Sequence, residues 1–224
     1  MTAPHLLFTS AKGGNCTTTT AAAWSLVRAG RGEHVCIVDL CGDQPATLGI
    51  AEPVGPGVHD WLGEHSSANV GQWWAMTTRI TAELSVIHRG APHVDGAPRW
   101  DDLADVLRSA PCTVVIDAGV GFVPPVLREI ARSVLVTRPC YLALRRATLA
   151  ARPDHVMVVK EDGRALTVRD VEHVLGVTQS TVVPWSSHIS RAVDAGLLPS
   201  RAETLFGDAF SGDVWLSNDD TSHP

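Results

Sequence analysis

A glycine-rich turn between an apolar segment and an alanine-rich segment constrains this chain most. Residues 5–20 read HLLFTSAKGGNCTTTT. The apolar run at 6–8 predicts a buried strand, the small residues at 10–16 predict a tight turn, and residues 18–30 predict a helix. In a parallel α/β protein this order directs backbone N–H groups and a helix N-terminus to one point, where they can hold a phosphate.

The side chains of this turn suit an anion and a metal ion. Gly13 and Gly14 let the backbone approach an anion closely, and Lys12 adds a positive charge. Thr18 offers a hydroxyl group to a metal. The same residue types also occur in ordinary strand-to-helix connections, so the turn alone leaves both interpretations open.

The turn resembles the phosphate-binding loop of the ParA/MinD group of P-loop ATPases, which reads approximately KGGxGKTT. Here the loop reads KGGNCTTT, and it shares the first lysine, the two glycines and the final pair of threonines. The resemblance implies an α/β fold whose doubly wound, mostly parallel sheet has about seven strands and helices on both faces. It also implies binding of ATP or ADP with Mg²⁺, which the departures described next make weak. The nucleotide-binding residues that it implies are Lys12, Gly13, Gly14, Asn15, Cys16, Thr17, Thr18, Thr19 and Pro184.

Two positions of the loop depart from this pattern. Cys16 replaces a glycine, and Thr17 replaces the lysine that contacts phosphate. The loss of one charge-assisted hydrogen bond, roughly 1.5 to 3 kcal/mol, weakens binding by about one to two powers of ten. If position 16 requires φ > 0, its Cβ costs about 1 to 2 kcal/mol. The loop is also similar to those of the atypical CpaE/TadZ-like branch, which lack the lysine. Because the phosphate-binding cation is missing and Cys41 also replaces an acid, we expect weak or absent hydrolysis.

Two apolar segments, HVCIVDL at 34–40 and CTVVID at 112–117, end in or near an aspartate. An acid at the carboxyl end of a buried parallel strand faces the ligand crevice. The segments resemble the DxD and Walker B motifs of the family, which implies a catalytic role for Asp39 and a metal site formed by Thr18, Asp39 and Asp117. Cys41 replaces the second acid of DxD. Asp43 is therefore a second catalytic candidate, acting through water, or else it caps the next turn.

The rest of the chain predicts alternating strands and helices. We expect further strands at 84–88, 133–137, 155–159 and 181–183, and further helices at 58–64, 71–80, 100–109, 125–132, 141–151 and 170–175. Residues 184–198 resemble the proline-led loop and helix at the nucleotide edge of ParA/MinD proteins. We assign residues 1–198 to a ParA/MinD-like domain and 199–224 to an acidic, partly disordered C-terminal tail.

Composition excludes several classes of protein. The 224 residues, 45% of them hydrophobic, fit one α/β domain. A net charge of −6 argues against a surface that binds nucleic acid or anionic lipid throughout. Without an apolar run of about 18 residues or a leader, we expect a cytoplasmic protein that does not insert into membranes. The five cysteines lack CxxC spacing, which predicts reduced thiols rather than zinc ligands or disulfides.

Three functions remain open. The first is an atypical nucleotide-binding protein that acts as a positional or scaffolding switch, of pilus, secretion or partition type, forms a homodimer and recruits an unidentified protein partner. The second is an active partition ATPase that binds DNA non-specifically, because residues 128–170 hold nine basic and five acidic residues. The third is a pseudoATPase that binds no nucleotide and serves as an interaction module. A dinucleotide-dependent oxidoreductase fits less well, because GxGxxG is absent.

Overall fold

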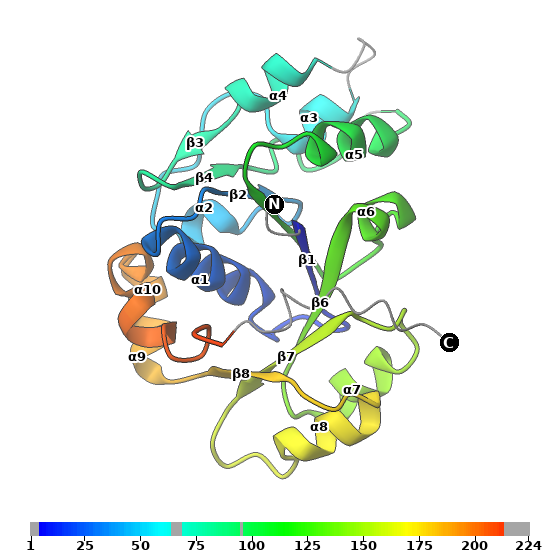
Figure 1. The fold of residues 1–224 in the computed structure, drawn as a ribbon, viewed down its shortest axis with the longest axis vertical. Coiled ribbons are helices and arrows are strands. Elements are labelled where there is room, and N and C mark those ends of the chain that lie inside the picture. Colours follow the sequence, from blue (N-terminus) through cyan, green and yellow to red (C-terminus); the bar gives the residue numbers. More distant parts are fainter. Residues whose placement is uncertain (1–4, 64–68, 95, 213–224) are drawn as a thin grey trace.

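The computed structural model describes residues 5–63, 69–94 and 96–212 as one sheet with helices on both faces (Figure 1). The sheet has eight strands in the order β3-β4-β2-β5-β1-β6-β7-β8, and only β3 runs antiparallel to its neighbour. The doubly wound, mostly parallel α/β fold is therefore confirmed. The strands are β1 His5–Thr9, β2 Val35–Asp39, β3 Thr78–Arg79, β4 Leu84–Ile87, β5 Thr113–Gly119, β6 Ala131–Thr137, β7 His155–Lys160 and β8 Thr181–Pro184.

The helices divide between the two faces of the sheet. They are α1 Thr17–Gly30, α2 Gln44–Thr47, α3 Val58–Gly63, α4 Val70–Ala75, α5 Trp100–Arg108, α6 Pro125–Ile130, α7 Tyr141–Ala147, α8 Val168–Leu175, α9 Ser187–Asp194 and α10 Leu198–Phe206. Helices α1, α2, α9 and α10 lie on one side, and α3 to α8 lie on the other (Figure 1). Side chains alternate along each strand, so Leu6 and Phe8 join the core under α1 while Leu7 joins the opposite core.

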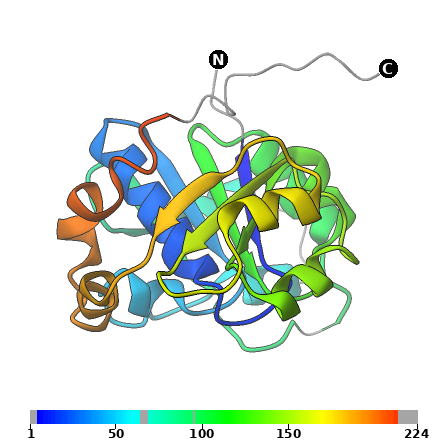
Figure 2. The same ribbon diagram turned by 90° about the horizontal axis from the view of Figure 1, so that it is seen from below.

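The parallel register brings the carboxyl ends of the central strands together. Asp39 of β2 pairs with Asp117 of β5, and Phe8 of β1 pairs with the same Asp117. In Figure 2 the central strands run from top to bottom, so that the loops after their carboxyl ends lie along the lower edge. The loop between β1 and α1 and both predicted acids therefore meet at one edge of the sheet.

The segment predicted as a helix at 71–80 is divided between two elements. Helix α4 ends at Ala75, and β3 then pairs antiparallel with β4. Trp73 is fully buried and packs edge-on against Trp61, with 5.1 Å between ring centroids, while Trp74 is half-buried. The helical prediction is wrong after residue 75, because pairing with a strand formed later in the chain decides where the helix ends.

Two other predicted helices are shorter in the structure. Helix α6 ends at Ile130 because β6 begins at Ala131, and α7 ends at Ala147 rather than at 151. No helix within the described ranges is both long enough and apolar enough to span a membrane.

A helix occupies the beginning of the segment that the sequence assigns to an acidic tail. Helix α10 packs against α1 and buries Ala202 and Phe206. Phe210 follows it, also fully buried, and stacks on Phe206 with 6.1 Å between ring centroids. The hydrophobic core thus extends to residue 210, and residues 213–224 lie outside the described part of the chain.

Candidate functional site

The loop between β1 and α1 has a left-handed backbone at the position where the related loops have glycine. Cys16 has φ 64° and ψ 32° and directly precedes α1. Within the described residues it is the one non-glycine residue with positive φ. Its carbonyl oxygen accepts a hydrogen bond from the N–H of Thr20, which begins the helix. This left-handed conformation costs about 1 to 2 kcal/mol because Cys16 has a Cβ.

Asn15 fixes the loop to the sheet from inside. Its side chain is almost fully buried, and Nδ2 donates a hydrogen bond of 2.8 Å to Oγ of Ser10. Ser10 Oγ in turn donates to the carbonyl oxygen of Val136 in β6 over 2.9 Å. The side chain of Asn15 thus anchors the loop, and the backbone remains for contact with a ligand.

A cleft of about 680 Å³ opens over this loop. All eight of the loop residues predicted to bind nucleotide line it. Its opposite walls come from the ends of β2 and β5 and from one residue each of α3 and α5. The lining residues are Leu40, Cys41, Asp43, His59, Trp100, Ala118, Gly119, Val120, Gly121 and Phe122. The cleft is open rather than filled by side chains.

Pro184, the remaining predicted nucleotide-binding residue, lies beside the cleft. It lines a smaller pocket of about 170 Å³ together with Trp185 and apolar residues of β7, β8 and α9. Cys16 and Thr19 line both cavities, so the two are adjacent. The structure therefore brings Pro184 next to the loop, but in a separate and more apolar compartment.

The two cations at the loop are held by protein atoms. Nζ of Lys12 donates to the carbonyl oxygen of Gly13 over 2.7 Å, so the side chain folds over its own loop. Arg138, which follows β6, donates from Nη2 to Sγ of Cys16 over 2.9 Å. Thr17, in the position of the missing lysine, is buried.

Arg138 is a site residue that sequence reasoning missed. Its guanidinium group lies 5.5 Å from the ring centroid of Trp185, and Nη1 lies 3.5 Å from a carboxylate oxygen of Glu161. The side chain therefore reaches the boundary between the cleft and the smaller pocket. Its place after the carboxyl end of a strand was the one available signal, because that edge of a parallel sheet faces the ligand.

Asp39 is fully buried and shapes the turn that follows β2. Its Oδ1 accepts hydrogen bonds from the backbone N–H groups of Cys41 and Gly42, over 2.9 and 2.8 Å. Its Oδ2 accepts from the N–H of Gln44 over 3.1 Å. Burial raises the pKa of Asp39, and these three hydrogen bonds oppose the rise.

Asp117 is fully buried beside Asp39. Its carboxylate accepts hydrogen bonds from Nε2 of Gln44 over 2.9 Å and from the N–H of Gly119 over 3.2 Å. Burial raises the pKa of Asp117 to about 6, and the charge of Asp39 adds to the rise, while hydrogen bonds from Gln44, Thr18 and Gly119 oppose it. The three predicted metal ligands thus lie together, and Gln44 joins them although sequence reasoning missed it.

Cys41 belongs to the same group. Its Sγ lies 3.5 Å from the carbonyl oxygen of Asp117 and 3.9 Å from Oδ1. Asp43, the second catalytic candidate, is exposed and lines the cleft. It is the N-cap residue of α2, but its side chain forms no capping hydrogen bond.

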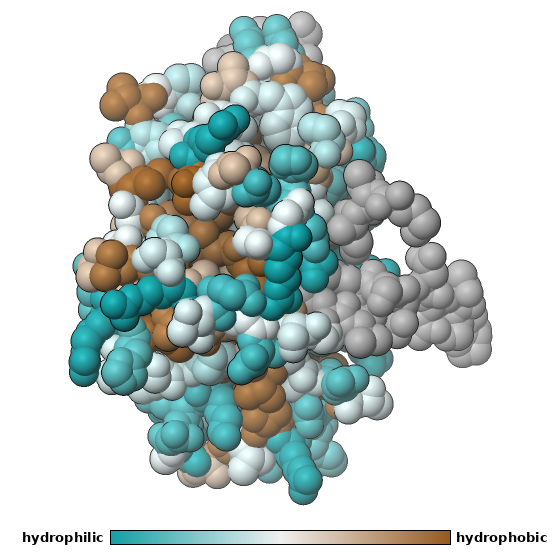
Figure 3. Space-filling view, turned by 60° about the vertical axis from the view of Figure 1, so that its left-hand side comes forward, coloured by the Kyte–Doolittle hydropathy of each residue, from teal (hydrophilic) through white to brown (hydrophobic). Residues whose placement is uncertain are grey.

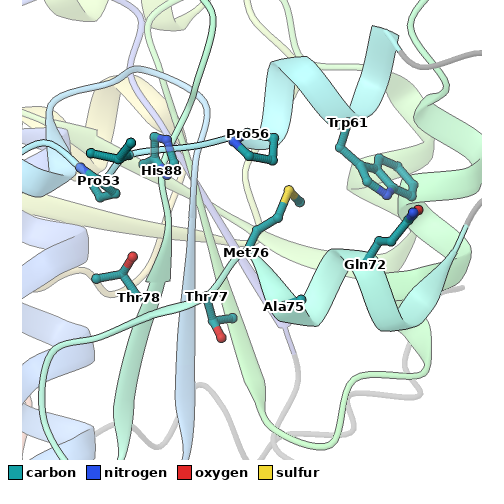
Figure 4. Close-up of a pocket in the computed structure, with 10 residues that line it drawn as sticks. Pro53, Pro56, Trp61, Gln72, Ala75, Met76, Thr77, Thr78 and His88 are labelled. Atoms are coloured by element: carbon teal, nitrogen blue, oxygen red, sulfur yellow. The ribbon is translucent and has the colours of Figure 1, made fainter.

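A second cavity, of about 430 Å³, lies away from the loop (Figure 4). Pro53 and Pro56, Trp61 of α3, Met76 and His88 are among its lining residues. His88 is buried, and its Nδ1 has no hydrogen-bond partner within the described structure. None of the residues predicted to bind nucleotide or metal, or to take part in catalysis, lines this cavity, so it is separate from the site at the loop.

Known proteins resemble this chain in structure rather than in sequence. No family model matches the sequence, and no curated protein matches it. A ParA family ATPase from Chlorobium tepidum has a TM-score of 0.79 at 20% identity, covering 95% of this chain and 98% of that chain. MinD of the MinC:MinD complex from Aquifex aeolicus has a TM-score of 0.73 at 14% identity and covers 99% of both chains.

A third similar structure contains a nucleotide. MinD from Pyrococcus horikoshii, complexed with Mg-ADP, has a TM-score of 0.69 at 16% identity, covering 94% of this chain and 93% of that chain. The chain therefore has the fold of the ParA/MinD-type ATPases, as the loop predicted. The closer likeness to the CpaE/TadZ branch stays a prediction.

Proposed function

We propose that the protein is a ParA/MinD-type nucleotide-binding protein that binds ATP or ADP with Mg²⁺ weakly, hydrolyses ATP poorly or not at all, and acts as a positional or scaffolding switch. The main support is the loop backbone, which keeps a left-handed turn at Cys16 although two side chains of the family pattern are replaced. Backbone N–H groups and a helix N-terminus bind phosphate without help from those side chains. The Mg-ADP complex of the similar MinD agrees with this proposal.

The two adjacent cavities suit the two parts of a nucleotide. The cleft over the loop has room for a polyphosphate, and the smaller pocket has apolar walls that suit a base. Lys12 and Arg138 are the cations at this place, and each already bonds a loop atom. Because binding must break or share those bonds, the phosphate charge is compensated less well than by a dedicated lysine, and affinity should be low.

The predicted ligands fit Mg²⁺ only in part. Mg²⁺ prefers oxygen ligands, and Thr18, Asp39 and Asp117 would supply them. The sulfur of Cys41 does not suit this ion. When bound, Mg²⁺ neutralises charge on the phosphates. Since Cys41 provides no carboxylate where the family has its second acid, we expect hydrolysis to be slow even when nucleotide is bound.

Exposed apolar side chains beside the cleft favour a homodimer that covers it. Val120 and Phe122 line the cleft and are 50% and 81% exposed. Tyr141 and Leu142, at the beginning of α7, are also exposed. Figure 3 shows another side of the molecule, the one that carries α9 and α10, where hydrophobic residues are interspersed with hydrophilic ones. Apolar side chains around a cleft mouth are typical of a contact surface, so we place the subunit contact at the cleft.

DNA binding is a second candidate function with narrower support. Arg145 and Arg146 are exposed side by side in the last turn of α7. Other basic residues of the 128–170 segment are engaged, because Arg138 and Arg164 both contact Glu161 and Arg152 donates to the carbonyl oxygen of Gly176. Retention on DNA that weakens steeply with salt would favour this function over the switch.

Calorimetry with ATP and Mg²⁺, beside a phosphate-release assay, tests the proposal. We expect weak binding to the unmodified protein, with no phosphate release above background. Lys12→Ala should weaken binding by about one to two powers of ten, the effect of one charge-assisted bond. Lys160→Ala is a matched control, because Lys160 is exposed and lines neither cavity.

Two outcomes would contradict the proposal. If neither ATP nor ADP produces heat of binding, the protein is a pseudoATPase interaction module. If phosphate release proceeds at the ordinary rate of a partition ATPase, the prediction of poor hydrolysis is wrong.

A further inference from the structure

Three possible metal-binding side chains meet at the ends of β2 and β5. One ligand atom each from Asp39, Cys41 and Asp117 lie within 4.8 Å of one another. Carboxylate oxygen and thiolate sulfur lie about 2.0 to 2.3 Å from Zn²⁺, so two ligands of one ion are at most about 4.5 Å apart. The three side chains are therefore close to the spacing of a metal site, and small side-chain movements suffice to complete it.

Two of the three side chains, Asp39 and Asp117, are buried carboxylates. Asp39 and Asp117 are both 0% exposed. None of the ion pairs formed between described residues includes either carboxylate. Buried negative charges close to one another are unfavourable unless a positive charge compensates them. A divalent ion among the three side chains would supply that compensation.

Gln44 provides an independent indication of a ligand. Its side chain is 0% exposed, and Nε2 donates to Oδ2 of Asp117 and to the carbonyl oxygen of Thr18, over 2.9 and 3.2 Å. These two bonds fix the orientation of the amide. Its Oε1 is buried and has no hydrogen-bond partner in the described structure. A metal ion, or a water molecule bound to one, would satisfy this oxygen.

The position of the thiol is set by the neighbouring backbone. Gly119 has φ 51°, and a Cβ at this residue would clash with Sγ of Cys41. The sulfur thus occupies space that only a glycine leaves free. The S–H group of Cys41 donates a hydrogen bond to the carbonyl oxygen of Asp117 over 3.5 Å.

We propose that Asp39, Cys41 and Asp117 form a site for a divalent cation that accepts sulfur, such as Zn²⁺, and that the site binds Zn²⁺ more tightly than Mg²⁺ in the absence of nucleotide. Zn²⁺ takes both thiolate and carboxylate ligands, whereas Mg²⁺ requires oxygen. On binding, the Cys41 S–H loses its proton to solvent and a sulfur–metal bond forms. This inference deepens the proposed function, because it names the metal class of the same site.

Zinc titration of the metal-free protein tests this site. We expect one Zn²⁺ per chain by calorimetry without nucleotide, bound at least about 100-fold more tightly than Mg²⁺, since Mg²⁺ gains nothing from a thiol. Cd²⁺ serves as an optical probe, because a thiolate ligand produces an ultraviolet charge-transfer band. Cys41→Ser should abolish this band and lower zinc affinity by about 100-fold, since even outer-shell changes cost about 10- to 100-fold. Cys41→Asp should shift the preference towards Mg²⁺.

Cys112→Ser and Cys140→Ser are matched controls, because neither residue lines the cleft over the loop. Both should keep the cadmium band and the zinc affinity of the unmodified protein. A metal ion bound only by surface histidines produces no thiolate charge-transfer band, so the cadmium spectrum distinguishes such binding from binding to Cys41. If Cys41→Ser does not fold, protection of the unmodified protein from iodoacetamide replaces it: Zn²⁺ should protect Cys41, read by peptide mass spectrometry, and Mg²⁺ should not.

The inference is overturned if Mg²⁺ binds as tightly as Zn²⁺, if the cadmium band survives in Cys41→Ser, or if zinc leaves alkylation of Cys41 unchanged. The zinc experiment contains no nucleotide, so its outcome is separate from that of the ATP experiment. Zinc binding without ATP binding would support the metal site and contradict the nucleotide-binding proposal. ATP binding without zinc binding would support the nucleotide-binding proposal and contradict the metal site.

Discussion

The two walls of the cleft respond differently to the replacement of a residue by cysteine. In the β1–α1 loop, Cys16 stands where the ParA/MinD loop pattern has a glycine, and its backbone is left-handed. At the ends of β2 and β5, Cys41 stands where the DxD pattern has its second acid, and its sulfur lies beside the carboxylates of Asp39 and Asp117. A site made of backbone groups tolerates a new side chain at the cost of strain, whereas a site made of side chains changes its chemistry.

The largest effect on stability is expected at the ends of β2 and β5, where Gly119 packs against the thiol of Cys41. Gly119→Ala places a Cβ against the thiol of Cys41 in a backbone of positive φ. Strain and overpacking together should lower the free energy of unfolding by about 2 to 5 kcal/mol, measured with urea. Gly30→Ala is the control, because no atom lies within 4 Å of the new Cβ and φ at this residue is not positive. It should change the free energy of unfolding by less than about 1 kcal/mol. Equal losses for the two variants would show that the thiol is not confined.

The next prediction concerns the buried charge of Asp117, at the same ends of β2 and β5. Because burial raises the pKa of Asp117 to about 6, the folded protein holds this proton more tightly than the unfolded chain, and stability falls as pH rises from about 4 to 7. Asp117→Asn removes this dependence. With a chelator present, the variant should exceed the unmodified protein by about 3 kcal/mol at pH 7 and match it near pH 4.

Urea unfolding across this pH range provides the measurement, and Asp43→Asn provides the control at an exposed carboxylate. A parallel pH dependence in the unmodified protein and Asp117→Asn would mean that the buried charge does not govern this wall.

At the loop, restoring the absent cation should strengthen nucleotide binding. Thr17→Lys adds a positive charge at the first residue of α1. The regained charge-assisted bond should raise ATP affinity by about one to two powers of ten in calorimetry. Thr17→Met, which adds length without charge, should leave affinity near that of the unmodified protein. An equal response to Lys and Met would show that this loop does not cradle phosphate.

The smallest effect concerns the strain itself. Cys16→Gly relieves a Cβ at φ 64°, which is worth about 1 to 2 kcal/mol, and the extra freedom of glycine in the unfolded chain offsets part of it. We expect a net gain of about 1 kcal/mol in the free energy of unfolding. Cys140→Gly, at φ −142°, relieves no strain and should show no gain. A loss at position 16 would mean that the contact of Cys16 with Arg138 outweighs the strain.

The parts of the fold that were predicted correctly follow local rules. Apolar runs that end in aspartate predicted β2 and β5, because a strand covered on both faces has few polar residues before it reaches the crevice. The small residues between an apolar run and an alanine-rich segment predicted the β1–α1 loop, because turn residues also act locally. The segment 71–80 and helix α10 were missed because their structure depends on partners distant in the chain, β4 and α1.

The sequence by itself determined most of the alternating strands and helices, the glycine-rich turn between β1 and α1, and the two acids at strand ends, since apolar periodicity and small residues act over a few positions. The tertiary structure alone decided that Arg138 reaches Cys16, that Gln44 joins the two buried aspartates, and that Cys41 can share a metal with them. No spacing rule along the chain predicts these contacts. They arise because parallel pairing brings the ends of separate strands to one edge of the sheet.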